Sequence, residues 1–68
     1  MSNKIPRKFN MIKGEMLINT SMNKIGDIVH ISKNEYGYVS HNTNTNKNAQ
    51  CFLSMLRNAN VIKILEII

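Results

Sequence analysis

The chain has 68 residues, with nine Lys or Arg against four Asp or Glu and a formal net charge of +5 at pH 7. This length fits one small domain with a thin core, and the single cysteine excludes an internal disulfide and a cysteine-rich zinc site. The sequence has neither the apolar core of a signal peptide nor a run of roughly 18 apolar residues for a membrane span, so we expect a cytoplasmic protein without a membrane partner.

The first element expected is a basic, flexible N-terminal arm over residues 1–13, followed by a single globular domain over residues 14–68. The arm has no acid before Glu15, and Pro6 prevents an early helix. Such a segment is either a solvated terminus or a surface that contacts phosphates or an acidic protein. Its cations are Lys4, Arg7, Lys8 and Lys13.

Three short strands are expected in the first part of the domain. Residues 15–18 are apolar and brief, residues 28–32 are rich in β-branched side chains, and residues 36–41 return as the second arm of a hairpin. These segments predict a small antiparallel sheet.

The two histidines lie one on each arm of that hairpin. A turn at residues 34–35 would place His41 opposite Ile28. In the same register His30 lies opposite Val39, and the two imidazoles share one face. Two histidines do not complete a zinc site, so we expect neither a metal nor a cofactor.

Two tyrosines, Tyr36 and Tyr38, are two positions apart and would share one face of the second hairpin strand. If that face is exposed, they form a stacking platform for nucleic-acid bases. If it faces inward, they are ordinary core residues, since aromatic side chains are common in strands.

An Asn/Thr run follows the hairpin, with four Asn and two Thr in residues 42–48. It is either a helix cap and connector, with Asn44, Thr45, Asn46 or Asn48 as N-cap, or a recognition loop rich in donors. The predicted helix start carries Lys47 and no acid. Its free backbone N–H groups would therefore suit an external anion such as phosphate.

From residue 46 onward, apolar residues recur at a helical period. Ala49, Phe52, Leu53 and Leu56 occupy positions i, i+3, i+4 and i+7, which predicts a helix that ends near residue 58. Residues 61–68 form an almost wholly apolar closing strand. The order β-β-β-α-β predicts a β-rich α+β domain, either an antiparallel sheet or a partly open SH3-like barrel, with one helix before the last strand.

The closing strand also predicts self-association. Its sequence, VIKILEII, is apolar at both alternating sets of positions, whereas a small single core covers only one face. We therefore expect a homodimer whose interface includes Ile62, Ile64 and Ile68. The alternative is a monomer in which the helix and the curled sheet cover both faces.

No arrangement of residues indicates catalysis. The four acids are isolated, the three glycines form no phosphate-binding loop, and Cys51 falls beside an apolar helix face. The sequence predicts a non-catalytic small basic binding protein for an anionic ligand, either nucleic acid or a nucleotide-type signal. The alternative is an inhibitor or adaptor that binds and blocks a host protein through an acidic surface.

The high content of Asn, Ile and Lys is typical of AT-rich coding DNA and suggests a phage or mobile element. The residues expected to contact the ligand are the cations of the arm, the two tyrosines, part of the Asn/Thr run and the cation late in the helix. They are Lys4, Arg7, Lys8, Lys13, Tyr36, Tyr38, Asn44, Thr45, Asn46, Lys47 and Arg57.

Overall fold

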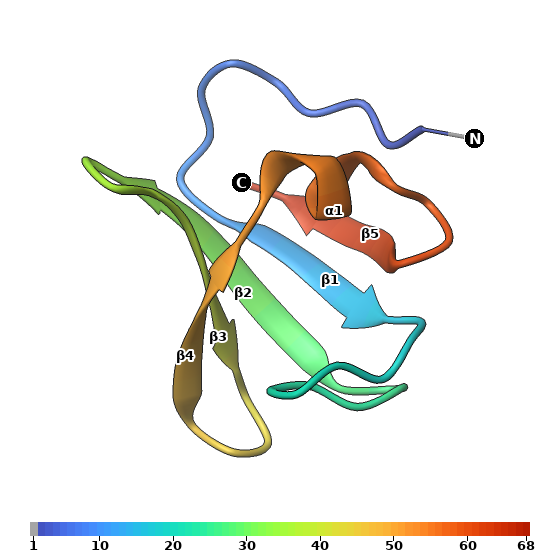
Figure 1. Cartoon of the computed structure of the whole chain (residues 1–68). Helices are drawn as coiled ribbons and strands as arrows, with labels where there is room; N and C mark the ends of the chain where they lie inside the picture. Colours follow the sequence, from blue (N-terminus) through green and yellow to red (C-terminus); the bar gives the residue numbers. More distant parts are fainter. Residues whose placement is uncertain (1) are drawn as a thin grey trace.

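The computed structural model describes residues 2–68 and shows an antiparallel sheet of five strands with one short helix (Figure 1). In chain order the elements are β1 (Ile12–Met16), β2 (Ile28–Asn34), β3 (Gly37–Asn42), β4 (Lys47–Cys51), α1 (Leu53–Arg57) and β5 (Ile62–Ile67). The strand order across the sheet is β4-β3-β2-β1-β5, so the last strand of the chain returns beside the first. The predicted β-rich antiparallel architecture is confirmed.

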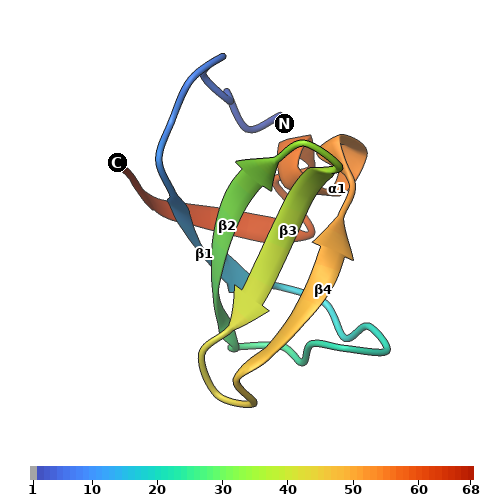
Figure 2. The same ribbon diagram turned by 90° about the vertical axis from the view of Figure 1, so that its left-hand side faces the viewer.

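The SH3-like barrel is not confirmed, because the sheet is not closed. Within residues 2–68, β4 pairs with β3 and β5 pairs with β1, and these two outer strands do not pair with each other. The sheet is strongly curled, so that β5 crosses behind β2 and β3 at a steep angle (Figure 2). Helix α1 lies at one end of this curl.

The core is built by alternating side chains of β1 and β2, as the period of two requires. In β1 the buried positions are Ile12, Gly14 and Met16, and in β2 they are Val29 and Ile31. The remaining elements contribute few side chains to this core, and the buried residue of α1 is Leu56. The apolar residues that complete the core are Cys51, Leu56 and Ile62.

The helix predicted from residue 46 is wrong over its first half, where the chain instead forms β4. In this strand Cys51 is buried while Asn48 and Gln50 are exposed, a pattern with a period of two. Pairing with β3 supplies the backbone hydrogen bonds that a helix would have made there. Helix α1 begins only at Leu53, and Phe52, expected on the buried helix face, is 57% exposed.

The β2–β3 hairpin has the expected strands in a different register. Its turn lies one residue later than predicted, so that His30 is directly opposite His41. The later turn places Gly37, with a φ of 119°, immediately after it, and glycine adopts this conformation without a Cβ penalty. The two histidines share a face, but the predicted pairs of His30 with Val39 and His41 with Ile28 are wrong.

The closing strand contains a bulge that the sequence does not reveal. β1 pairs Gly14 with Ile64 but Lys13 with Glu66, so that Leu65 is an extra residue in β5. A bulge of this kind moves the following side chains to the opposite faces. The strict alternation expected for VIKILEII is therefore wrong beyond Ile64.

The bulge changes which isoleucines face inward. Ile62 is 1% exposed in the core, Ile64 packs against that core, and Ile67 lies opposite the buried Ile12. The predicted interface required Ile62 to be a surface residue, but Ile62 is interior in the single chain. Ile68, 56% exposed beyond the strand, keeps the accessibility that the interface needs, and the homodimer stays a prediction.

The exposed residues at β5 are both charged and apolar, since Leu65, Ile67 and Ile68 are 42%, 40% and 56% exposed. Lys63 lies opposite Glu15, and Glu66 lies opposite Lys13, in the register of β1 and β5. Opposite charges at directly facing positions stabilise a sheet by about 0.2–1 kcal/mol per pair.

The segment before β1, which includes the predicted arm, lies along α1 and the start of β5 (Figure 1). Hydrogen bonds of Asn3 hold this segment in place. The Asn3 N–H donates to the Arg57 carbonyl at 2.7 Å. The Asn3 side chain donates to the carbonyls of Leu56 and Ile62, both at 2.9 Å. Ile5 and Phe9 pack against the core. These contacts position the loop between them, which carries two cations.

Candidate anion-binding site

Four cations from three parts of the chain surround two adjoining surface cavities of about 750 and 370 Å³. Arg7 and Lys8 come from the N-terminal segment and Lys33 from the end of β2, and these three line both cavities. Arg57, from the last turn of α1, lines the smaller one. No Asp or Glu is among the residues that line either cavity. We call these four cations the basic site.

An aromatic pair lies beneath the basic site. The rings of Phe9 and Tyr38 stack with centroids 6.1 Å apart and planes inclined by 11°. Lys33 is the cross-strand partner of Tyr38, and its Nζ lies 5.7 Å from the Tyr38 ring centroid. Because both rings also pack against the core, they hold the N-terminal segment and β3 together at this point.

The arrangement suits an anion with several oxygens. All four cationic side chains are exposed, so a ligand reaches them without opening the fold. Arginine presents a planar fork of donors that matches phosphate, and lysine adds a compact point charge. Gathering like charges on one surface raises the potential there and favours a polyanion.

Sequence reasoning found part of this site. Arg7, Lys8, Tyr38 and Arg57 were predicted ligand residues, and the fold brings them together. Lys33 was missed, although its place opposite Tyr38 would have followed from the correct hairpin register. Phe9 was also missed, and its signal was only its position next to Lys8.

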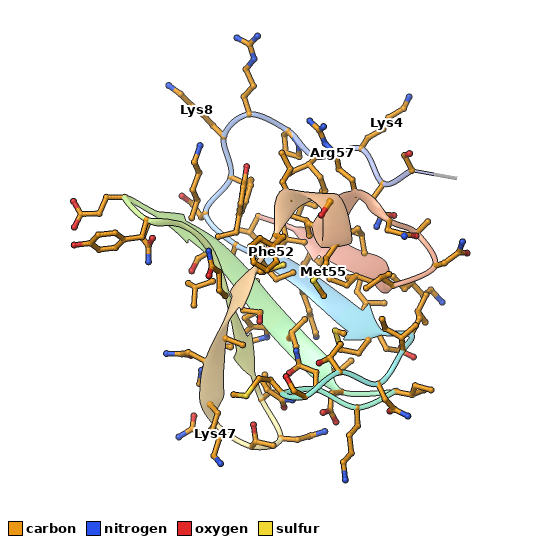
Figure 3. All side chains as sticks on the ribbon, in the orientation of Figure 1. Lys4, Lys8, Lys47, Phe52, Met55 and Arg57 are labelled. Carbon is orange, nitrogen blue, oxygen red and sulfur yellow. The ribbon has the colours of Figure 1, made fainter. Side chains whose placement is uncertain are left out.

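Other predicted ligand residues lie elsewhere. Lys4 is exposed on the N-terminal segment at the same end of the molecule as Lys8 and Arg57, whereas Lys47 lies at the opposite end (Figure 3). Lys13 is in β1 between its cross-strand partners on β2 and β5, outside both cavities. The predicted anion site at a helix start is wrong, because Lys47 begins a strand.

The Asn/Thr run has a structural role that no helix cap explains. Asn44, Thr45 and Asn46 form the turn between β3 and β4, and none caps a helix, so the predicted N-cap is wrong. The preceding Asn42 is 1% exposed, and its Oδ1 accepts from the N–H groups of Asn44 at 2.8 Å and Thr45 at 3.2 Å. Asn46 has a φ of 60°, which asparagine tolerates better than most residues.

Asn42 also connects the β3–β4 turn to the loop before β2. Asn42 Nδ2 donates to Asn23 Oδ1 at 2.9 Å and to Asp27 Oδ2 at 2.8 Å. Asp27 also accepts from the Lys24 N–H at 2.9 Å and from Asn44 Nδ2 at 2.7 Å. These bonds, the backbone one foremost, lower the pKa of the Asp27 carboxyl.

The expectation that Tyr36 and Tyr38 share one strand face is wrong. Tyr36 lies in the β2–β3 turn and is 84% exposed, while Tyr38 is half-buried in β3. Both nevertheless border a third cavity of about 340 Å³ at the edge of the basic site. The polar residues that line it are Asn34, Asn48 and Gln50.

Metal-ligating and nucleophilic side chains do not gather into a site in the part of the chain that the structure describes. Among residues 2–68 no three potential metal-ligating side chains lie together, and His41 Nδ1 is 2.6 Å from Asn48 Oδ1. Burial raises the pKa of the Cys51 thiol, which disfavours a reactive thiolate. No helix in this same part of the chain has the length and apolar character of a membrane span.

Comparisons with known proteins add no further information about this site. No protein-family model, no curated protein and no solved structure matches the chain at a significant level. The basic site is therefore interpreted from its own geometry.

Proposed function

We propose that this protein is a non-catalytic binding protein for a phosphate-bearing ligand, nucleic acid or nucleotide, which it holds at the basic site. The observation that carries the proposal is the convergence of Arg7, Lys8, Lys33 and Arg57 on two adjoining cavities that no Asp or Glu lines. In the sequence Lys33 and Arg57 are far from each other and from the neighbouring Arg7 and Lys8, so the meeting of these three segments is a property of the fold.

The physical reason is electrostatic. Solubility alone is served by cations spread among acids over the whole surface. Four exposed cations around one concave region repel each other in the free protein, and a bound polyanion relieves that repulsion and releases counterions. The stacked rings of Phe9 and Tyr38 keep the cations in place.

We also propose that the curled sheet corresponds to a partly open SH3-like barrel. The support is the position of β5 beside β1 and of α1 between β4 and β5 in the chain. In this description the basic site lies at the end of the barrel where the N-terminal segment crosses α1.

A salt titration tests the function. Binding of a labelled oligonucleotide, followed by fluorescence anisotropy, should weaken with salt along a log–log slope of about −2 to −3, as expected for three or four phosphates of a single strand. An acidic protein surface, the alternative ligand, predicts little oligonucleotide binding at any salt concentration.

A matched pair of charge reversals makes the test specific to the site. Lys8→Glu and Lys47→Glu change the net charge equally, but only Lys8 belongs to the basic site, and the two residues lie at opposite ends of the molecule (Figure 3). We expect Lys8→Glu to weaken oligonucleotide binding by tenfold or more, and Lys47→Glu by a much smaller factor, of the order of long-range screening. Equal losses in the two variants would contradict the proposed site.

A further inference from the structure

We infer that the third cavity, bordered by Tyr36, Asn34, Asn48 and Gln50, is a pocket for a nucleobase, and that the ligand is therefore single-stranded nucleic acid. This inference rests on the proposed function, because the pocket is adjacent to the basic site and would act together with it.

The pocket and the basic site form one continuous surface around the tip of the β2–β3 hairpin. Asn34 lines both the 750 Å³ cavity and the 340 Å³ pocket. Tyr38 lines both the 370 Å³ cavity and the same pocket. Lys33 and Tyr38 belong to one face of the sheet, and Asn48 and Gln50 belong to the other. A strand whose phosphates lie against Lys8 and Lys33 would therefore pass around the tip of the hairpin to bring its next group beside Tyr36.

The chemistry of the pocket differs from that of the basic site. None of its lining residues carries a charge, and Tyr36 offers a ring that is 84% exposed. Asn34 Oδ1 accepts the Tyr36 N–H at 2.8 Å, and Asn48 Oδ1 is 2.6 Å from His41 Nδ1. These contacts orient the two amides and leave the Nδ2 group of each as the donor for a ligand. A flat, uncharged ring with hydrogen-bonding edges is the group that such a pocket fits.

The charged residues near the hairpin determine which part of the ligand lies at which position. Glu35 is exposed next to Tyr36 in the turn and does not line the pocket. Its carboxylate repels phosphate from the tip of the hairpin, while Arg7, Lys8 and Lys33 attract it on the other side. Phosphates are therefore favoured on the basic site and a base on the tyrosine.

An exposed tyrosine distinguishes single strands from duplexes. In a duplex the faces of the bases are stacked on each other, whereas a single strand offers them to an aromatic side chain. Stacking on one ring tolerates any base, so the expected ligand is a single strand with little sequence preference.

Three probes with the same label test the assignment: a single-stranded oligonucleotide, the same strand with abasic sites, and its duplex. Tyr36→Ala should weaken binding of the single strand about tenfold, the loss expected for one stacked base, and leave the abasic strand unaffected. Tyr36→Phe keeps the ring and should bind like the parent. Because Tyr36 is exposed in a turn, both variants should retain the circular dichroism spectrum of the parent.

The outcomes separate this inference from the function on which it rests. If Lys8→Glu weakens binding of all three probes while Tyr36→Ala changes none, the nucleobase pocket is wrong and the basic site stands. If Lys8→Glu changes no probe, the basic site itself is wrong. Competition by a mononucleotide as effective as that by the strand would overturn the assignment to single-stranded nucleic acid in favour of a nucleotide.

Discussion

Asn42 and Asp27 are joined side chain to side chain, with Asn42 Nδ2 donating to Asp27 Oδ2 at 2.8 Å. Together with the bond from Asn44 Nδ2 to Asp27 Oδ1, it links the turn after β3 to the loop before β2. Because Asn42 is fully buried, the link lies in a place where an unpaired polar group is costly.

Replacing Asn42 by Ala should destabilise the fold by about 1–3 kcal/mol. The substitution removes the donor to Asn23 and Asp27 and the acceptor for two backbone N–H groups of the turn. Urea denaturation followed by circular dichroism measures the loss, and Asn60→Ala, at an exposed asparagine, is the control. A midpoint for Asn42→Ala equal to that of the control would show that the network contributes nothing.

Stability should fall in acid because of Asp27. Its pKa in the folded protein is lowered from the ordinary value of 3.8 by hydrogen bonds from the Lys24 backbone and from Asn42 and Asn44. A lowered folded-state pKa means that the contribution is fully present above the unfolded pKa and is lost as the pH falls through the folded one. The urea midpoint should thus be constant above about pH 5 and decrease below it.

Asp27→Asn is the variant that identifies the group responsible. It should have a lower midpoint than the parent at neutral pH and a weaker dependence on pH between about pH 5 and pH 2. An identical acid dependence in the two proteins would assign the effect to other carboxyls.

Gly14→Ala should destabilise the sheet by about 1–3 kcal/mol, the usual cost of overpacking a core. A Cβ at this position would lie 2.7 Å from Cγ2 of Ile62, closer than real contacts allow. Ile62 is itself held in the core and has little room to move. Gln50→Ala, at an exposed position of another strand, is the control, and thermal unfolding is the measurement.

Substitutions of Asn46 test the backbone conformation of the β3–β4 turn. With a φ of 60°, Asn46→Gly should leave stability unchanged or slightly raised, whereas Asn46→Val should lower it by about 1–2 kcal/mol because a β-branched residue is strained in this conformation. Equal stabilities of the Gly and Val variants would mean that the turn adopts another conformation in solution.

Lys33 and Lys13 separate the observed basic site from the cluster predicted by the sequence. Only Lys33 lines the cavities, while Lys13 was expected in the ligand site and lies on β1. Lys33→Gln should weaken oligonucleotide binding several-fold and reduce the slope of the salt titration by roughly one phosphate. Lys13→Gln should leave that slope unchanged, and the reverse result would restore the sequence-based set.

The middle of the fold could be predicted from the sequence because its pattern has one interpretation. Residues 28–32 lie in β2 as predicted, and of the predicted strand 36–41 all residues but Tyr36 lie in β3. The segment around Ala49 fits both a strand and a helix. Its period of two through Cys51 and its period of 3.6 through Leu53 coexist, and only the pairing with β3 decides between them.

Two further features depend on contacts distant in the sequence. An apolar run such as VIKILEII gives no sign of a bulge, because an inserted apolar residue leaves the composition of both faces unchanged. The basic site was predicted only in part, because one of its residues also depends on strand pairing. The distribution of charges in the sequence indicates Arg7, Lys8 and Arg57, but the register of the hairpin is needed to add Lys33.

The hydrogen bonds of Asn3 have a consequence for the order of folding. Its side chain joins the carbonyls of Leu56 and Ile62, which are 53 and 59 residues away along the chain. Closing loops of this length is entropically costly, so this contact forms late, after the central hairpins. The side-chain bond to Ile62, which helps to fix the loop that carries Arg7 and Lys8, therefore requires β5 to be in place.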